Sequence, residues 1–194
     1  INIKVSKELG IPEDILVVAG TTDSNAAVIA ANPSTGEGVT ILGSTIVIKK
    51  FIDNPIYRKN LTNHFIIGKW LCGGSSNTGG RVLRKFFSDQ EIIELSKQIN
   101  PDIETNIKLL PLAEKGERFP IDDPSLEPIL TPRPVSDSLY LQALLEGLAE
   151  IESQGWEKLI SLGIPKPHRI ITIGSGSKNI QWKKIRERII GIPI

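Results

Sequence analysis

The strongest indication of fold class in this chain is the segment Val17-Val18-Ala19-Gly20-Thr21-Thr22-Asp23-Ser24-Asn25-Ala26-Ala27. The apolar residues 15–18 predict a strand that is buried on both faces. A tight turn follows, and the Ala-rich residues 23–31 predict a helix that ends at Asn32-Pro33. Asp23 would then lie just beyond the C-terminal end of a strand, at the edge where open α/β sheets bind their ligands.

Two further turns rich in glycine and serine occur at the ends of predicted strands. Gly43-Ser44-Thr45 separates the β-branched stretches 38–42 and 45–50, and Gly174-Ser175-Gly176-Ser177 follows the short strand 169–173. Small residues allow backbone N–H groups to approach phosphate oxygens, and a carboxylate can act as base for an acceptor hydroxyl. Each turn also has an ordinary interpretation, as a hairpin turn or as a strand-to-helix connection.

The rest of the chain alternates between strand and helix patterns. Residues 64–72 have a β-like pattern, with Gly68-Lys69 as a candidate hairpin tip. The Gly-dense residues 73–80 predict a flexible loop, and the Pro-rich residues 100–134 predict an irregular connection. Helical spacing occurs at 82–87, 91–98, 138–162 and 181–190, and Gly155 can divide the longest of these into two helices. This succession predicts an α/β fold.

Composition limits the classes of function. The 194 residues have a net charge of +1, which gives no electrostatic basis for binding nucleic acid or an acidic membrane. The single cysteine, Cys72, excludes an internal disulfide framework and a Cys-based zinc site, and the two histidines are too far apart to suggest a metal cluster. Because no apolar run approaches the roughly 18 residues of a membrane span and no signal-peptide pattern occurs, a cytoplasmic protein is expected.

Two features lead us to expect that the chain is a fragment of a longer polypeptide. It contains no methionine, and its last residues, Gly191-Ile192-Pro193-Ile194, have the pattern of the beginning of another strand.

The local sequence leaves two interpretations of Asp23 open. Aspartate is a preferred N-cap residue, so Asp23 could simply cap the helix that follows it. Alternatively, its carboxylate could be a general base that accepts the proton of a substrate hydroxyl as that oxygen attacks phosphorus. Residues 174–179 similarly suit anion binding at a helix N-terminus, although their spacing fits neither the Walker A loop nor Gly-x-Gly-x-x-Gly.

Side chains near the C-terminus and Cys72 have simpler interpretations. Trp182 is expected in the core or at an interface, and Cys72 is expected to be a small buried apolar residue. The basic residues Lys183, Lys184, Arg186 and Arg188 are expected to form a solvated face of the last helix.

Taken in order, these segments resemble the C-terminal half of the FGGY carbohydrate kinases, a family that includes glycerol kinase, xylulokinase and ribulokinase. The resemblance is strongest to the cyanobacterial and plant ribulokinase/xylulokinase-like branch, through Asp-Ser-Asn-Ala-Ala, Leu-Gly-Ser-Thr and the Ser-Asn-Thr-Gly-Gly loop. It implies an α/β fold of the actin-like ATPase (ribonuclease H-like) type, with a mixed sheet flanked by helices. Residues 1–194 would form a single ATP-binding C-terminal domain.

The resemblance also implies roles for individual residues. Asp23, after Gly20, Thr21 and Thr22, matches the position of the catalytic base. The second phosphate-binding turn corresponds to Gly43, Ser44 and Thr45, and the Gly-rich helix start that lines the nucleotide site corresponds to Gly73, Gly74, Asn77 and Gly79. The adenosine motif corresponds to Gly174, Ser175, Gly176, Ser177 and Asn179, followed by Trp182; Ser175 stands where the family has the middle of three glycines. Leu144-Leu145-Glu146-Gly147-Leu148-Ala149 is similar to the signature of the family's long helix.

The activity that the resemblance implies is phosphorylation of a sugar by ATP with Mg²⁺, the sugar being a pentulose such as D-ribulose or D-xylulose. An N-terminal kinase domain would supply the sugar pocket, a magnesium-organising aspartate and the first phosphate loop, because no Asp-x-Gly-Thr segment occurs in this chain. The final strand and helices of the family are absent as well. The isolated fragment is therefore expected to be inactive and to pair with that domain or with a second copy. In a plant, a plastid location is an alternative to the cytoplasm.

Two other functions compete with a sugar kinase. An actin-like or chaperone-type ATPase would use the same fold for assembly or conformational work. A non-catalytic fragment would bind nucleotide weakly or only pair with a partner domain.

Overall fold

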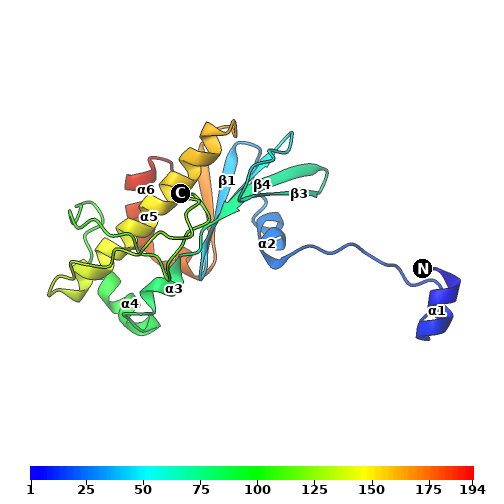
Figure 1. The fold of residues 1–194 in the computed structure, drawn as a ribbon, viewed down its shortest axis with the longest axis horizontal. Coiled ribbons are helices and arrows are strands. Elements are labelled where there is room, and N and C mark those ends of the chain that lie inside the picture. Colours follow the sequence, from blue (N-terminus) through cyan, green and yellow to red (C-terminus); the bar gives the residue numbers. More distant parts are fainter.

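The computed structural model describes residues 1–194, and its centre is one five-stranded sheet (Figure 1). The strands are β1 (Glu37–Leu42), β2 (Ile46–Ile52), β3 (Leu61–Ile66), β4 (Lys69–Ser75) and β5 (Arg169–Ile173), in the order β3-β4-β2-β1-β5. Neighbours among the first four strands are antiparallel, whereas β5 pairs with β1 in parallel. The predicted mixed sheet flanked by helices is therefore confirmed.

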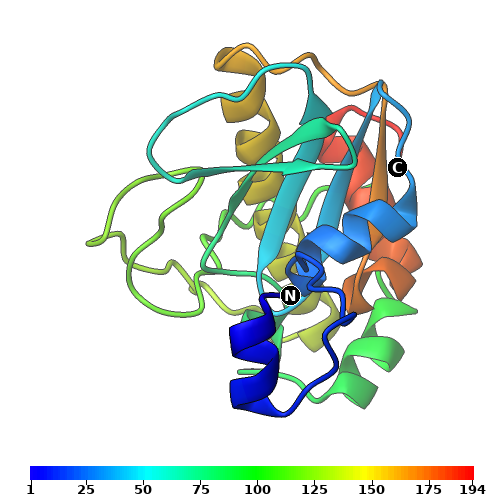
Figure 2. The ribbon, with the colours of Figure 1, turned by 90° about the vertical axis from the view of Figure 1, so that its right-hand side faces the viewer.

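Helices cover both faces of the sheet. The helices of the chain are α1 (Ile3–Leu9), which lies away from the sheet, α2 (Asp23–Ala31), α3 (Gly80–Leu83), α4 (Asp89–Ser96), α5 (Asp137–Ser161), α6 (Ile180–Ile190) and the 3₁₀ turn η1 (Ser175–Lys178). In Figure 1, α5 and α6 lie on one side of the sheet and α2 on the other. Figure 2 shows α2 crossing the face that is turned away from α5.

Two separate apolar clusters fill these layers, because successive side chains of a strand point to opposite faces. Ile46 and Ile48 of β2 belong to the larger cluster, which packs against the apolar face of α5. Phe51 of the same strand belongs to a small cluster on the α2 face, where Val28 of α2 is fully buried. The α2 helix is thus held by much less apolar surface than α5.

The first 22 residues form an arm that extends away from the sheet (Figure 1). The predicted buried strand at 15–18 is wrong: Leu16, Val17 and Val18 are 85, 81 and 80% exposed and belong to no strand. The physical reason is that a strand needs a partner, and the five strands of this chain pair only among themselves. No helix of the chain is long and apolar enough to cross a membrane.

Two other predictions about local structure need correction. The Gly-dense residues 73–80 are not one flexible loop, since Gly73 and Gly74 are paired with β2 and β3 inside β4. Gly155 does not divide the long helix, because α5 continues through it and packs it against Ile48 and Phe119. In both places a glycine serves close packing rather than chain flexibility.

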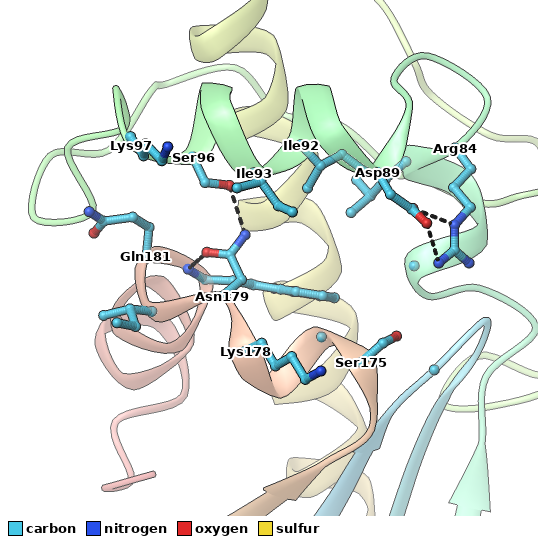
Figure 3. Close-up of a pocket in the computed structure, with 16 residues that line it drawn as sticks. Arg84, Asp89, Ile92, Ile93, Ser96, Lys97, Ser175, Lys178, Asn179 and Gln181 are labelled. Carbon is cyan, nitrogen blue, oxygen red and sulfur yellow. Dashed lines mark hydrogen bonds and ion pairs between the residues drawn. The ribbon is translucent and has the colours of Figure 1, made fainter.

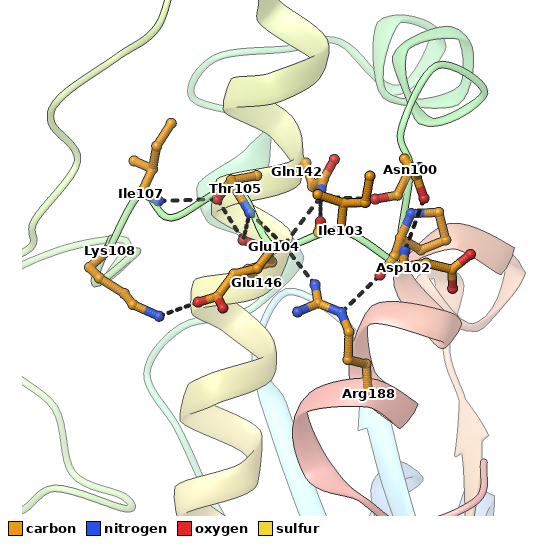
Figure 4. Close-up of polar contacts among 11 residues, drawn as sticks. Asn100, Asp102, Ile103, Glu104, Thr105, Ile107, Lys108, Gln142, Glu146 and Arg188 are labelled. Carbon is orange, nitrogen blue, oxygen red and sulfur yellow. Dashed lines mark hydrogen bonds and ion pairs between the residues drawn. The ribbon is translucent and has the colours of Figure 1, made fainter.

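Side chains of α5 and α6 bind the irregular segment between α4 and α5, and the carboxylate of Glu146 is at the centre of these contacts (Figure 4). Glu146 of α5 is 6% exposed and accepts hydrogen bonds from the hydroxyl of Thr105 at 2.6 Å and from the guanidinium of Arg188 on α6 at 2.7 Å. Gln142, one turn earlier, donates to the carbonyl oxygen of Ile103 at 2.6 Å. These bonds join the irregular segment to both α5 and α6.

Candidate functional site

Two of the predicted turns meet at one edge of the sheet. Because β1 and β5 are parallel, with Ile41 opposite Ile173, both strands end at that edge. Gly174 has a φ of 94°, and a Cβ there would lie 2.5 Å from the carbonyl oxygen of Leu42. Only glycine permits this approach, which places the turn after β5 beside the turn after β1.

The helix start after β4 packs onto the same turn. The N–H of Gly80 donates to the carbonyl oxygen of Gly43 at 2.9 Å, and the N–H of Arg81 donates to that of Ser44 at 3.3 Å. A Cβ at Gly79 would lie 2.6 Å from the backbone of Thr45. The three Gly-containing segments therefore converge through direct backbone contact.

A cleft of about 510 Å³ opens between α4 and the turn after β5 (Figure 3). Its α4 wall presents the apolar Ile92 and Ile93, the second of which is 54% exposed, beside the polar Asp89 and Ser96. The residues that line it are Gly43, Gly80, Leu83, Arg84, Asp89, Ile92, Ile93, Ser96, Lys97, Ser175, Gly176, Lys178, Asn179, Ile180, Gln181 and Trp182. An apolar cleft with a few polar groups is typical of a small-molecule site.

The charges around this cleft favour an anionic ligand. Three of its lining side chains are cationic, but Arg84 is paired with Asp89 and Lys97 with Glu94, each at 2.8 Å, so that Lys178 is the unpaired cation. Asp89 accepts a hydrogen bond from Nε of Arg84 at 2.8 Å, which raises the pKa of that guanidinium, so the two charges offset each other. Lys178 has no carboxylate partner and remains available to an anion.

Two residues that line the cleft have buried polar atoms without a hydrogen-bond partner, as is expected at a ligand-binding site. Gln181 Oε1 and Trp182 Nε1 are buried without a hydrogen-bond partner. Buried polar atoms normally have one, so an acceptor and a donor are left for a bound molecule or water. Asn179 is not free in this way, because its amide donates to Ser96 Oγ at 2.8 Å and accepts from the N–H of Trp182 at 3.0 Å.

A second, more polar cleft of about 340 Å³ lies beside the β1–β2 turn. It is lined by Ser44, Thr45, Asn77, Arg81, Glu114, Lys115 and Gly116. The turn thus borders both clefts, since Gly43 faces the first and the two hydroxyl residues face the second. An elongated ligand with an apolar end and a polar end could reach both along this turn.

Asp23 is the first residue of α2, on the other face of the sheet, and does not line the apolar cleft. The N-cap position belongs to Thr22, whose side chain makes no capping bond, so the interpretation of Asp23 as the N-cap is wrong. The side chain of Asp23 is exposed, and its Oδ1 accepts a hydrogen bond from the N–H of Ser24 at 2.7 Å. Gly20, Thr21 and Thr22, expected in the same site, belong to the exposed end of the arm.

Some predicted binding residues lie away from the cleft, and some lining residues were not predicted. A Cβ at Gly73 would lie 2.1 Å from the carbonyl oxygen of Ile48, and one at Gly74 would lie 2.6 Å from the ring of Phe119, so both glycines serve sheet packing. Gly174 and Ser177 support the turn without lining the cleft. No residue of α4 was predicted to bind a ligand, although its Ser88–Glu91 capping box marks a well-defined helix at this position.

No protein-family model matches the sequence. Solved structures of several sugar kinases nevertheless share its fold. A xylulose kinase from Lactobacillus acidophilus superposes with a TM-score of 0.75 at 20% identity, over 98% of this chain and 41% of that one. A xylulose kinase from Rhodospirillum rubrum superposes with a TM-score of 0.73 at 18% identity, over 99% of this chain and 41% of that one. A Plasmodium falciparum glycerol kinase, solved with ADP, superposes with a TM-score of 0.70 at 20% identity, over 88% of this chain and 37% of that one.

At these identities the likeness concerns the fold: the chain has the actin-like ATPase fold of these kinases. It spans about two fifths of the length of the structures that it matches.

Proposed function

We propose that this chain is the nucleotide-binding lobe of an FGGY-type carbohydrate kinase that transfers a phosphoryl group from ATP to a sugar hydroxyl. The observation that carries the proposal is the cleft between α4 and the turn after β5, with apolar Ile92 and Ile93 on one wall, the unpaired cation Lys178 and two unpaired polar atoms. The fold shared with xylulose and glycerol kinases supports it. A pentulose is the proposed acceptor, in line with the branch of the family that the motifs resemble.

In this proposal the nucleotide follows the β1–β2 turn. The base and ribose occupy the apolar cleft against Ile92 and Ile93, and the phosphates approach the backbone of Gly43 and the hydroxyls of Ser44 and Thr45. Exclusion of water by the apolar wall strengthens the attraction between the phosphates and the cations around them.

Asp23 is the proposed general base and accepts the proton of the attacking sugar hydroxyl. Magnesium, when bound with ATP, supplies positive charge against the phosphate oxygens. No group of three or more His, Cys, Asp or Glu side chains in this chain is placed to hold a metal ion, so we assign its protein ligands to a second lobe.

A second lobe is part of the proposal because Asp23 and the cleft lie on different faces of the sheet. Phosphoryl transfer needs acceptor and nucleotide to be held on one reaction path, and in this proposal the second lobe supplies the acceptor site beside Asp23. The exposed apolar residues Leu16, Val17 and Val18, directly before Asp23, are suited to contact such a body.

The activity is tested by assaying the polypeptide that contains this chain with ATP, Mg²⁺ and a panel of sugars. Sugar-dependent release of ADP, greatest with pentuloses, is expected. ATP hydrolysis that is indifferent to every sugar would instead support the actin-like or chaperone-type ATPase. Nucleotide binding without any turnover would support the non-catalytic alternative.

The nucleotide cleft is tested separately with two matched substitutions. Ile93→Asp places a carboxylate on the apolar wall, whereas Ile103→Asp changes an isoleucine of similar exposure, 62% against 54%, that does not line the cleft. Loss of an apolar contact worth about 1.5 kcal/mol should weaken ATP binding roughly tenfold for the first variant. Calorimetric titration of both variants checks this, and equal affinities would place the nucleotide elsewhere.

A further inference from the structure

Lys49 is a buried cation that the proposed nucleotide cleft does not explain. It lies in β2, is 4% exposed, and points to the sheet face that α2 covers. Its ammonium group donates hydrogen bonds to Ser24 Oγ at 3.2 Å and to Asn25 Oδ1. Both acceptors belong to the first turn of α2 and directly follow Asp23.

The contacts continue from this ammonium group to the residues before Asp23. The side-chain amide of Asn25 donates to the hydroxyl of Thr21 at 3.0 Å, and the hydroxyls of Ser24 and Thr22 lie 3.3 Å apart. One side chain of the sheet therefore holds residues on both sides of the proposed base.

The rest of α2 gives this turn little support. Val28 is its one fully buried apolar residue, and the N-cap Thr22 makes no side-chain capping bond. Burial of the Lys49 ammonium disfavours its charge and lowers the pKa of the amine, whereas the nearby Asp23 carboxylate raises it. An apolar side chain such as Phe51, two residues along the same face, could fill this space without that cost, but it could not hold the turn by hydrogen bonds.

We propose that Lys49 is a positioning residue, which fixes the segment 21–25 against the sheet so that the carboxylate of Asp23 is held toward the acceptor hydroxyl. This inference rests on the proposed kinase function. A general base must lie within hydrogen-bond reach of the proton that it removes, and a displacement of about 1 Å can cost about 10² in rate.

The neighbouring Lys50 provides a matched control. It is 2% exposed and points to the opposite face, where it donates to the carbonyl oxygens of Thr35 at 3.1 Å and Glu37 at 3.2 Å. Burial lowers the pKa of this amine as it does for Lys49. The two lysines thus share strand, burial and charge, and they differ in what they hold.

The kinetic test compares Lys49→Met with Lys50→Met in the polypeptide that contains this chain. Lys49→Met should lower kcat for sugar phosphorylation by about 10- to 100-fold and leave KM for ATP unchanged, because nucleotide contacts are intact. Lys50→Met should lower thermal stability and retain kcat. An unchanged kcat in Lys49→Met, or an equal loss in both variants, would overturn the inference.

A second variant covers the case in which Lys49→Met does not fold. Asn25→Ala removes the main acceptor from the other side of the same contact. It should reproduce the loss of kcat, and the double variant should lose no more than the larger single effect, because both changes break one interaction. Additive losses would contradict a shared role.

An NMR measurement on the 194-residue chain separates this inference from the kinase proposal. Amide resonances of residues 21–25 should shift strongly in Lys49→Met and stay in place in Lys50→Met. If they stay in place in both, Lys49 does not hold the segment and the inference fails, even for an active kinase. If the wild-type polypeptide phosphorylates no sugar, the proposed function fails, while these resonances still decide whether Lys49 anchors the turn.

Discussion

At the scale of single residues, the proposed chemistry depends on the carboxylate of Asp23. This carboxylate is exposed in the first turn of α2, and a negative charge at that position is favoured by the helix dipole by about 0.3–1 kcal/mol. A substitution of Asp23 can therefore affect both catalysis and stability. The two effects differ in size, because loss of a general base typically changes a rate by about 10²–10⁴.

Asp23→Asn should lower kcat for sugar phosphorylation by about 10²–10⁴ and leave ATP affinity unchanged, because a base acts on the acceptor rather than on the nucleotide. Steady-state kinetics and ATP titration measure both quantities. Asp53→Asn, in the loop that follows β2, is the control for loss of one carboxylate. Full turnover combined with a stability loss of about 1 kcal/mol would reduce Asp23 to a favourable charge at a helix start.

Arg186 shows what local sequence conceals at this scale. It was expected on a solvated helix face but is 1% exposed and pairs with Glu152 of α5, with N···O distances of 2.6 and 2.8 Å. Its guanidinium also donates to the hydroxyl of Thr172 at 2.8 Å. The sequence contains one indication that Arg186 is buried: it follows Trp182 by four residues, which places both side chains on one helix face.

At the scale of secondary-structure elements, α5 has two glycines that meet different surroundings. A Cβ at Gly147 would lie 2.8 Å from the carbonyl oxygen of Leu109 and 2.7 Å from the ring of Pro111. A Cβ at Gly155 would lie 3.0 Å from the end of the Ile48 side chain and 3.1 Å from the ring of Phe119. The first position is closed by backbone, and the second by side chains that can move.

Gly147→Ala should therefore lower the free energy of unfolding by about 1–3 kcal/mol, as is usual for overpacking. Gly155→Ala should change it by less than about 1 kcal/mol, because small side-chain shifts are offset by the higher helix propensity of alanine. Denaturant unfolding of both variants measures the difference. Equal losses would mean that the backbone around Leu109 yields as easily as the side chains around Gly155.

How far the sequence predicts these elements depends on where their partners lie. The family resemblance assigned the turns after β1 and β5 to nucleotide binding, and the two turns do lie together, because parallel strands end at a common edge. The strand predicted at 15–18 is absent, since its apolar residues meet no partner in this chain. The apolar wall from α4 was missed, because Ile92 and Ile93 follow ordinary amphipathic spacing and only the fold brings them to the turn.

At the scale of the whole molecule, a compact body and an exposed arm behave differently. Residues 16–20 form no hydrogen bond with the rest of the chain, and three consecutive apolar side chains, Leu16, Val17 and Val18, are at least 80% exposed. The body is held by a cluster of 23 buried apolar residues and a continuous five-stranded sheet. Proteases should therefore cleave the arm far more rapidly than the body.

Brief digestion of the 194-residue chain with thermolysin, which cleaves before large apolar residues, should cut first at Leu16, Val17 or Val18 and leave the body intact. In the polypeptide that contains this chain, the same bonds should resist cleavage, because the proposed second lobe would cover these side chains. A variant with these three residues and the neighbouring exposed Ile15 changed to serine is the control: its body should stay folded while the early cut disappears. Equally rapid cleavage of the arm in the longer polypeptide would show that no second lobe covers it, and with that the proposed joining of Asp23 to the nucleotide cleft would lose its structural basis.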